Sequence, residues 1–345
     1  MLLKQIALNN FRNFSRQAFH FSPLLTVIIG ANSLGKTNLL EGIYFIINGT
    51  GFRETKEIEL INFERLKSAQ VEGIFEEGQL KYRFKIILTV SGDSLQKSFL
   101  VNGSRKRHIQ YSQDQTRCVL FTPQQIEILT GSPQKRRDYF NKFIALYDYE
   151  YKKRLDNFDN GLRRRNKILE HYKDKLKLKE EIVFWDNYLE EQSSYLIKKR
   201  QEYSDFLNQN HNIDAKAFKI NYLKNEFTKE AAERLFDREA LVRKTLLGPQ
   251  KDDFQILLQE KDIHRFGSRS EQRLTILWLK INEILYHEQT VKKQPILLFD
   301  DIFSELDSKN KKLVLSLVEK YQTVSTTTDR EIPALAKVPH EIIHL

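Results

Sequence analysis

The pattern of apolar and polar positions gives the N-terminal part of the chain an α/β character. Residues 24–29 form a run of apolar β-forming residues, which predicts a strand buried on both faces. Helical spacing follows over residues 36–47, and residues 70–101 then alternate between apolar and polar side chains as strands do. A strand is also expected at residues 5–8. The first third of the protein therefore predicts strands around at least one helix.

The middle of the chain has a different pattern. No proline occurs between Pro133 and Pro249, and apolar residues recur every three or four positions over 139–162. A second apolar stripe runs through Ile182, Trp185, Leu189, Leu196 and Tyr203. This spacing places one apolar face along each of two helices. We therefore predict a helical, hairpin-like insertion that is too short for a long coiled coil.

The last hundred residues return to the α/β pattern. The predicted strands lie at 254–258, 295–299 and 323–325, and the predicted helices lie at 270–287 and 308–320. The two ends of the chain therefore share one character, and the middle differs from both.

Composition and charge limit what the protein can do. Of the 345 residues, 56 are Lys or Arg and 46 are Asp or Glu, and the net charge of +10 favours a polyanionic partner. No apolar run is long enough for a transmembrane helix, and polar residues appear too early for a signal peptide. The single cysteine, Cys118, excludes an internal disulfide and is expected to be a buried apolar residue. We expect a cytoplasmic protein without a membrane partner.

One motif points to nucleotide chemistry. Residues 30–37 read G-x-x-x-x-G-K-T between the buried strand and the helix, which is the setting of a phosphate-binding loop. Lys36 is expected to reach the β- and γ-phosphates of ATP, and Thr37 to offer a hydroxyl to Mg²⁺. A chance match on a glycine turn is the alternative. The predicted nucleotide-binding residues are Gly30, Ala31, Asn32, Ser33, Leu34, Gly35, Lys36, Thr37 and Asn38.

A pair of carboxylates ends a predicted strand far along the chain. In the segment PILLFDD, Asp300 and Asp301 follow a buried apolar run, at the edge where α/β sheets bind ligands. Asp300 is expected to hold Mg²⁺ with Thr37. Asp301 is expected to polarise the attacking water, which makes Asp301 and Lys36 the predicted catalytic residues. The alternative is that the two carboxylates merely end a strand.

The distance between these two motifs predicts the domain organisation. Lys36 and Asp300 are 264 positions apart, so two halves of one ATPase must be separated by an insertion. This split is similar to that of ABC/SMC-type P-loop ATPase heads. We predict an α/β head made of residues 1–130 and 245–345, with an inserted helical arm domain at 131–244.

Two further stretches resemble motifs of ABC/SMC-type heads. Ser304 and Asp307 follow the carboxylate pair as a D-loop does. Ser268, Ser270 and Glu271 open the predicted helix before the carboxylate strand, at the place of the signature motif. Their expected role is to meet the γ-phosphate bound to a second subunit. An ordinary helix start with Ser268 as its cap is the alternative.

The chain as a whole resembles the RecF family, the SMC-like recombination-mediator ATPases of bacteria. The resemblance rests on ordered short elements: Asn10–Phe14, Phe52–Thr55 ahead of Ile58–Ile61, Phe121–Pro123, Gly131–Pro133 with Arg136–Arg137, Leu247–Asp253 and Thr326–Asp329. It implies an ATP-dependent homodimer that binds gapped or single-strand/double-strand junction DNA and hydrolyses ATP weakly, stimulated by DNA. It also implies RecR as a partner, RecO and RecA loading in the wider pathway, and roles in DNA repair, replication-fork maintenance and the SOS response.

The basic residues cluster where an arm could meet DNA. Residues 131–180 hold 15 Lys and Arg against 8 Asp and Glu, a surplus of seven. Contacts of such residues with phosphates are independent of base sequence and sensitive to salt. A solvated helix face is the alternative. The predicted DNA-binding residues are Arg105, Lys106, Arg107, Lys152, Lys153, Arg163, Arg164 and Arg165.

A different functional class also remains open at this point. An SMC-like ATPase subunit of a nuclease or defence system would carry the same nucleotide motifs. Asp252–Asp253 and Glu180–Glu181 are the carboxylate clusters left over for such a role. An ABC transporter subunit conflicts with the charged helical insertion.

Overall fold

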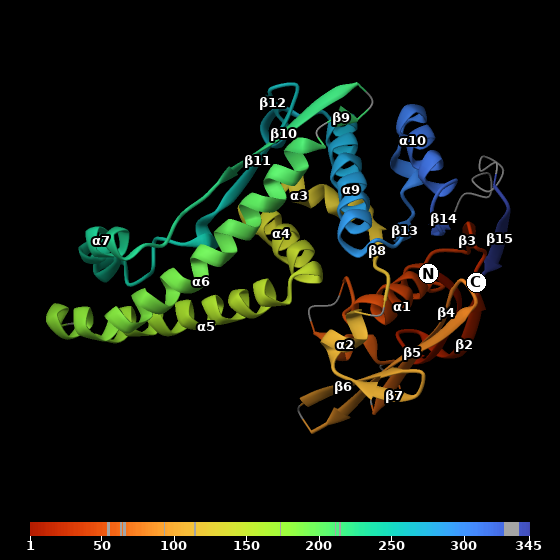
Figure 1. Ribbon diagram of the computed structural model, residues 1–345, viewed down its shortest axis with the longest axis horizontal. Helices are drawn as coiled ribbons and strands as arrows, with labels where there is room; N and C mark the ends of the chain where they lie inside the picture. Colours follow the sequence, from red (N-terminus) through yellow and green to blue (C-terminus); the bar gives the residue numbers. More distant parts are fainter. Residues whose placement is uncertain are drawn as a thin grey trace. The chain divides into compact units, whose positions relative to one another are not determined.

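The computed structural model describes residues 1–53, 56–62, 64, 67–92, 94–113, 115–172, 174–210, 212–213, 215–327 and 338–345 (Figure 1). The chain forms two compact units. The first, which we call the head unit, consists of residues 1–125 and 277–345, and the second, the arm unit, consists of residues 126–276. One α/β unit is therefore built from both ends of the chain, as the separation of the nucleotide motifs predicts.

A parallel sheet of five strands forms one layer of the head unit, in the order β15-β3-β14-β13-β8. Every residue of the first four strands along the chain is buried, in agreement with the apolar runs of β3, β8 and β13; β14 is equally buried although four of its five residues are Ser or Thr. Because the strands are parallel, the residues that follow them meet at one edge of the sheet. The strands are β3 (Leu25–Ile29), β8 (Cys118–Phe121), β13 (Ile296–Asp300), β14 (Thr323–Thr327) and β15 (His340–His344).

An antiparallel sheet of six strands forms the second layer, in the order β2-β1-β4-β5-β6-β7. Its strands alternate between buried and solvent-facing residues, which explains the alternating pattern in this part of the sequence. The strands are β1 (Leu2–Phe11), β2 (Phe14–His20), β4 (Ser68–Glu77), β5 (Leu80–Ser91), β6 (Ser94–Val101) and β7 (Ser104–Lys106). The short helix α2 (His108–Gln113) follows them.

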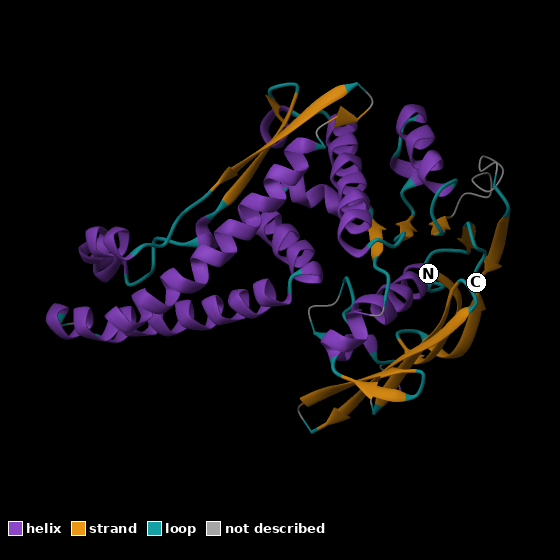
Figure 2. Ribbon diagram, viewed as in Figure 1, coloured by secondary structure: helices purple, strands orange, loops and turns teal. Residues whose placement is uncertain are grey.

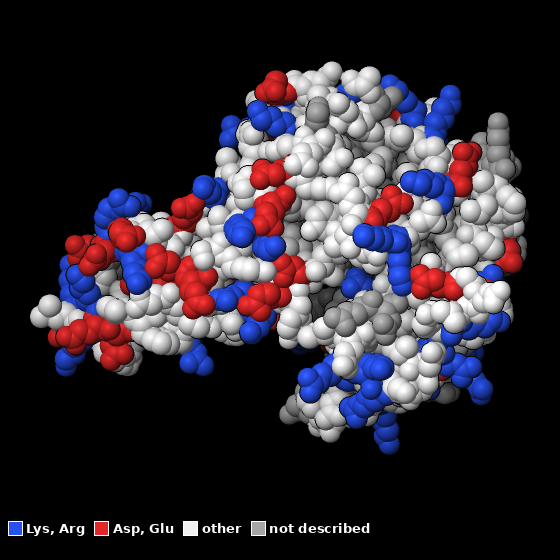
Figure 3. Space-filling view, viewed as in Figure 1, with Lys and Arg blue, Asp and Glu red and all other residues white. Residues whose placement is uncertain are grey.

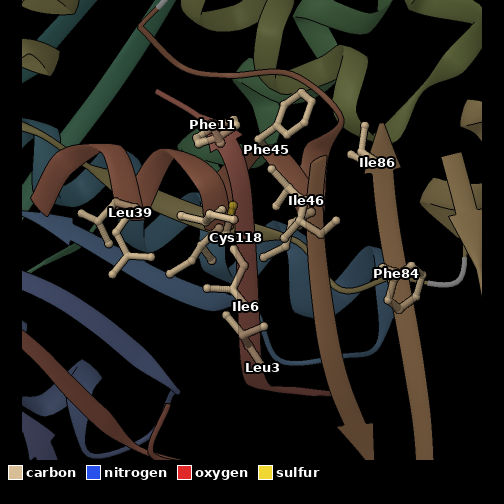
Figure 4. Packing of buried hydrophobic residues seen from close by; sticks show 14 of the residues in the cluster. Leu3, Ile6, Phe11, Leu39, Phe45, Ile46, Phe84, Ile86 and Cys118 are labelled. Atoms are coloured by element: carbon tan, nitrogen blue, oxygen red, sulfur yellow. The ribbon is translucent and has the colours of Figure 1, made fainter. Parts of the chain in front are cut away.

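Helix α1 (Lys36–Asn48) joins the two layers, since it packs on strands of both sheets. Its apolar face contributes Leu39, Phe45 and Ile46 to a core that also contains residues of both sheets (Figure 4). Cys118 lies in this core, as predicted, and burial raises the pKa of its thiol to about 12. The core thereby holds the strand and the helix on either side of the predicted phosphate loop in place.

Most of the arm unit is helical, and Figure 2 shows the contrast with the strand-rich head unit. Helices α5 (Tyr149–His171) and α6 (Lys175–Gln209) form the predicted hairpin. The first apolar stripe, however, covers two helices. Helix α4 (Pro133–Tyr147) ends before Asp148, whose side chain then caps α5 by accepting a hydrogen bond from the Tyr151 amide.

The arm unit also contains a small sheet that the helical prediction missed. Strand β10 (Lys216–Leu223) pairs with β11 (Asp253–Leu258), and the sheet has the order β12-β11-β10-β9. This pairing places residues 245–276 in the arm unit, whereas the prediction assigned them to the head. The pairing joins distant segments, so a local pattern does not reveal it. The other elements are β9 (Asn212–Ile213), β12 (Lys261–Asp262), α3 (Glu127–Thr130), α7 (Lys229–Val242) and α8 (Ile263–Phe266).

Two further α-helices follow the small sheet along the chain. Helix α9 (Arg269–Val291) begins in the arm unit and ends in the head unit, and α10 (Ser308–Val318) belongs to the head unit. Among the helices that the structure describes, none is long and apolar enough to cross a membrane.

Candidate nucleotide-binding site

The predicted phosphate loop lies between β3 and α1. Gly35, the residue before α1, has a φ of 106°, and a Cβ atom there would lie 2.6 Å from the side chain of Asn13. Only glycine fits both constraints. The ammonium of Lys36 donates hydrogen bonds to the carbonyl oxygens of Gly30 (2.6 Å) and Ala31 (3.0 Å). The side chain therefore folds back along the loop, and its charge lies among the loop's backbone groups.

The strand order brings the second motif to the same edge. Strand β14 lies between β3 and β13, and Asp300 is the last residue of β13. The Thr37 hydroxyl donates a hydrogen bond of 2.9 Å to Asp300 Oδ1, across 263 positions of sequence. Asp300 is only 7% exposed. Two residues that the sequence predicts for one metal site are thus in direct contact.

These two oxygen ligands suit a magnesium ion. Mg²⁺ prefers oxygen donors and keeps several waters when it binds beside phosphates, so it needs few protein ligands. Among the described residues, no group of three or more His, Cys, Asp and Glu is arranged to hold a metal. The paired oxygens of Thr37 and Asp300 therefore fit a metal that is bound mainly by a nucleotide.

Asp301 has an unusual backbone conformation next to this pair. Its φ is 51°, in the left-handed region, and its amide donates hydrogen bonds to the carbonyl (3.2 Å) and hydroxyl (3.0 Å) oxygens of Thr326. The Thr326 hydroxyl in turn donates to Asp300 Oδ1 at 2.9 Å. Thr326 of β14 thus fixes the side chain of Asp300 and the backbone of Asp301 by hydrogen bonds. The sequence includes Thr326 in a family element without a role; Thr328 and Asp329 of that element lie outside the described residues.

The predicted D-loop follows directly. The Ser304 hydroxyl donates a hydrogen bond to the Asp301 carbonyl at 2.9 Å. Asp307 caps helix α10 by accepting from the Asn310 amide at 2.8 Å. Both side chains therefore shape the chain that leaves the carboxylate pair. A contact of either residue with a second subunit stays a prediction.

Polar side chains for which we predicted no role also contact the phosphate loop. Asn13 donates a hydrogen bond to the Leu34 carbonyl (3.1 Å) and accepts one from Asn38 (2.7 Å). Its side chain therefore bridges the loop and the first turn of α1. The segment Asn10–Phe14 carries a recognisable family pattern, which is the signal that could have identified Asn13.

The same cluster contains a buried carboxylate. Glu41 of α1 is fully buried and accepts from Arg12 at 2.7 Å and from Arg53 at 2.6 Å. Burial by itself raises the pKa of Glu41, but hydrogen bonds and charge from Arg53 and Arg12 outweigh it and lower the pKa below its ordinary value. Glu41 is therefore ionised and fixes both arginines next to the loop. Glu54 and Thr55, which follow Arg53, lie outside the described residues.

The predicted signature residues form a helix cap in the arm unit. The Ser268 amide and hydroxyl both donate to Glu271 Oε2 at 2.8 Å, and the Glu271 amide donates to the Ser268 hydroxyl at 3.3 Å. This reciprocal pattern is a capping box at the start of α9. Hydrogen bonds from Lys261 and Ser268 lower the pKa of Glu271 to about 2. Ser268 and Ser270 are exposed, so the capped helix start is accessible.

Most of the predicted DNA-binding residues lie on the surface. In the head unit, Arg105, Lys106 and Arg107 are exposed at the end of the six-stranded sheet, where Figure 3 shows a concentration of basic residues over β6 and β7. In the arm unit, the exposed predicted residues are Lys152, Lys153, Arg163 and Arg164. Lys152 pairs with Asp156 at 2.6 Å and Lys153 with Glu150 at 3.7 Å.

Arg165 is the exception, and its predicted role was wrong. It is fully buried, with ion pairs to Asp186 (2.7 Å) and Glu239 (2.8 Å) and a hydrogen bond to the Thr245 hydroxyl. Arg165 lies on the face of α5 that also carries the buried residues Gly161 and Leu169, whereas Arg163 and Arg164 are exposed. Arg165 therefore connects α5, α6 and α7 inside the arm unit and is not available to DNA.

The two carboxylates at 252–253 also have structural partners. Asp252 is buried and accepts hydrogen bonds from Arg200, from Tyr222 and from the Asn225 amide. Asp253 pairs with Arg136 at 2.6 Å. Both side chains thus hold the sheet of the arm unit against α4 and α6.

Comparison with known proteins places the chain in a family. The model of the RecF/RecN/SMC N terminal domain matches residues 2–337. The chain is 32% identical to the DNA replication and repair protein RecF of Natranaerobius thermophilus, over 96% of this chain and 92% of that protein. The chain belongs to the RecF family. A second RecF, from Caldanaerobacter subterraneus subsp. tengcongensis, is 30% identical over 96% of this chain and 95% of its own length.

Solved structures agree with this assignment. The recombination mediator protein RecF in the RecFOR pathway, solved with an ATP analogue, superimposes with a TM-score of 0.83 at 28% identity, over 95% of this chain and 92% of that one. Its ATP-bound form gives a TM-score of 0.81 at 28% identity, over 98% and 93%. An SMC head bound to a winged-helix domain of ScpA has a TM-score of 0.51 at 17% identity, over 97% and 92%, and shows the shared fold alone. The predicted ABC/SMC-type ATPase head with an inserted arm is therefore confirmed.

Proposed function

We propose that this protein hydrolyses ATP and binds DNA in recombinational repair and at replication forks. The observation that carries the proposal is the contact between Thr37 of the phosphate loop and Asp300 of β13. That contact completes a nucleotide site from opposite ends of the chain. The RecF relatives named as DNA replication and repair proteins, and the RecF structures solved with ATP and its analogue, support the same activity.

Phosphate binding follows from the loop. Gly30 to Asn38 present backbone amides at the start of α1, where the helix dipole favours negative charge. Lys36 is poised to leave the Gly30 and Ala31 carbonyls for the β- and γ-phosphates of ATP, a stronger partner for an ammonium. Thr37 and Asp300 would hold Mg²⁺, which supplies charge neutralisation on the phosphates when bound.

Hydrolysis requires an oriented water molecule. We assign this role to Asp301, which lies next to the metal-binding pair and is fixed by Thr326. Its carboxylate accepts a hydrogen bond from the water that attacks the γ-phosphorus, while Lys36 stabilises the charge on the transferred phosphoryl group. The products are ADP and inorganic phosphate.

Two copies are proposed to close on ATP. The exposed helix start at Ser268, Ser270 and Glu271 of one copy would meet the γ-phosphate held by the other, with the D-loop residues Ser304 and Asp307 at the joint. Binding of ATP then favours the dimer, and hydrolysis releases it. This arrangement follows the family resemblance and makes the nucleotide a switch.

The DNA partner and the protein partners complete the proposal. The exposed basic residues of the arm unit and of the β7 region would contact phosphates without reading base sequence, on gapped or junction DNA. The RecFOR pathway named for the structural relatives supports RecR and RecO as partners. The loading of RecA, in the cytoplasm, is part of the proposal that follows from the family resemblance.

ATP turnover with and without gapped DNA is the direct test. We expect slow hydrolysis that DNA accelerates, and loss of nucleotide binding or turnover in Lys36→Ala. Lys312→Ala removes an exposed lysine of α10 and is the matched control. Turnover that survives in Lys36→Ala would refute the site.

The dimer switch has its own test. Asn tolerates the left-handed backbone of position 301, so Asp301→Asn should keep the fold while it slows hydrolysis. We expect this variant to accumulate as an ATP-bound dimer on size-exclusion chromatography. An exclusively monomeric profile with ATP would exclude the switch.

A further inference from the structure

An aromatic cluster lies on the surface of the arm hairpin. Phe184 and Trp185 are consecutive residues of α6, and Tyr188 lies about one turn further on. Ring centroids are 5.0 Å apart for Phe184 and Trp185 and 5.7 Å apart for Trp185 and Tyr188. Phe184 is 63% exposed, and two other apolar side chains of α6, Val183 and Leu176, are exposed as well. Trp185 and Tyr188 are half-buried. Phe184 thus exposes most of its ring to solvent, next to two rings that are partly accessible.

A basic side chain of α5 borders one of these rings. The guanidinium of Arg164 lies over the Trp185 ring, 5.5 Å from its centroid. Arg163 and Lys167 of the same helix are also exposed. Gly161, one turn before Arg164, permits the close approach of α5 and α6, because a Cβ there would lie 3.0 Å from the Tyr188 ring. We call Arg164, Phe184, Trp185 and Tyr188 the aromatic–basic surface.

We propose that the aromatic–basic surface binds single-stranded nucleic acid by stacking unpaired bases. Exposed rings beside cations are the features that such binding requires, since bases stack on the rings while Lys and Arg neutralise the phosphates. Duplex DNA hides its base faces, and it needs only the cations. The inference rests on the proposed DNA-binding function and adds to it the strand type that this surface takes.

The exposed rings add binding energy only when the ligand carries bases that can stack on them. A polyanion without bases would use Arg163, Arg164 and Lys167 and leave Phe184 in water. Glu181, one turn before Phe184 on α6, is exposed and opposes any anion nearby. Glu181→Gln is therefore expected to tighten binding of a single strand.

The aromatic–basic surface contains a natural fluorescent probe. Trp185 is one of two tryptophans, and the other, Trp278, is buried in the head unit. Titration of the full-length protein with a short oligothymidylate is expected to quench the fluorescence of Trp185. Trp185→Phe should abolish that signal. A quench that persists in Trp185→Phe would place the ligand elsewhere and overturn the inference.

Substitutions then separate stacking from charge. Phe184→Ala is expected to weaken oligothymidylate binding between about 5-fold and 100-fold, the range for loss of one stacked base. Phe184→Tyr keeps the ring and should bind as the wild type does. Tyr149→Ala removes an exposed aromatic ring of α5 that lies outside the aromatic–basic surface, and it is the matched control.

An oligomer of the same length without bases decides the question. If bases stack on the rings, the abasic strand has a low affinity for the wild type. That affinity should be no higher than the affinity of oligothymidylate for Phe184→Ala. Equal affinity for the two strands, or unchanged binding in Phe184→Ala, would overturn the inference and leave the rings as a surface for a protein. Phe184→Ala and Phe184→Tyr change no charge, so their duplex affinity and ATP turnover are expected to match the wild type and report separately on the proposed function.

Discussion

At the scale of single residues, the nucleotide site depends on small polar side chains that lie outside the recognised motif. Asn13 connects the loop at Leu34 to helix α1 at Asn38, and Thr326 connects Asp300 to Asp301. Neither side chain needs to touch the nucleotide to matter. Each one limits the positions that a phosphate-binding or carboxylate residue can adopt.

Asn13→Ala tests this positioning role. Loss of two hydrogen bonds, each worth about 1 kcal/mol, is expected to raise KM for ATP roughly 3- to 30-fold. The value of kcat should change little, because Asp301 and Lys36 are untouched. Steady-state ATPase kinetics measure both constants. Gln17→Ala, an exposed amide on β2, is the control, and a loss confined to kcat would contradict the positioning role.

A buried histidine gives the head unit a pH dependence of its own. His287 of α9 is fully buried, and burial, with the positive charges of Arg117, Lys293 and the N-terminus, lowers its pKa to about 4. Between about pH 6.5 and pH 4 the unfolded chain binds a proton that the folded chain does not. Folding stability therefore falls as the pH is lowered through this window.

His287→Gln should remove that dependence. Between pH 7 and pH 5 we expect the wild type to lose about 2 kcal/mol more unfolding free energy than the variant. Urea unfolding at the two pH values measures the difference. Identical pH dependence in both proteins would show that folding leaves the pKa of His287 unchanged.

At the scale of the elements, buried ion pairs hold the arm together. Arg165 of α5 contacts Asp186 of α6 and Glu239 of α7, so three helices share one guanidinium. Phe227 lies against the same group, 5.5 Å from ring centroid to guanidinium carbon. The contacts fix the hairpin on which the aromatic–basic surface lies.

Arg165→Met is expected to destabilise the protein by about 3–5 kcal/mol, because it leaves the buried carboxylate of Glu239 and the half-buried one of Asp186 without their cation. Arg163→Met, two positions away and exposed, should change stability by no more than about 0.5 kcal/mol. Urea unfolding measures the free energy of unfolding of both variants. Comparable losses in both variants would mean that Arg165 is not buried as described.

At the scale of the whole molecule, one unit carries the nucleotide chemistry and the other carries most of the exposed basic surface. The predicted loop, Thr37, Asp300 and Asp301 all belong to the head unit, while Ser268 and Glu271 belong to the arm unit. Helix α9 is continuous between them. Each unit has its own buried residues, so ligand binding to one need not stabilise the other equally.

Hydrogen exchange in the presence of ATP and Mg²⁺ tests this division. At a ligand concentration of about 100 Kd, peptides of β3, α1 and β13 should gain up to about 100-fold protection, equivalent to ~2.7 kcal/mol. Peptides of α5 and α6 should gain less. Equal protection across both units would instead show that the chain opens as a single cooperative body.

Much of this protein could be predicted from local patterns alone. The phosphate loop, the carboxylate pair, the buried strands and the hairpin helices depend on residues close together in sequence, where spacing determines which face is buried. The separation of Lys36 from Asp300 even predicted a head made from both ends of the chain. These features followed from periodicity and motif spacing, and the structure contains them.

Only the tertiary structure decided the rest. Local spacing alone does not show that Arg165 is buried, because the partners that bury it come from α6 and α7. The pairing of β10 with β11, and the hydrogen bonds made by Asn13 and Thr326, likewise join distant segments. Such contacts depend on how the whole chain packs, so no local pattern specifies them.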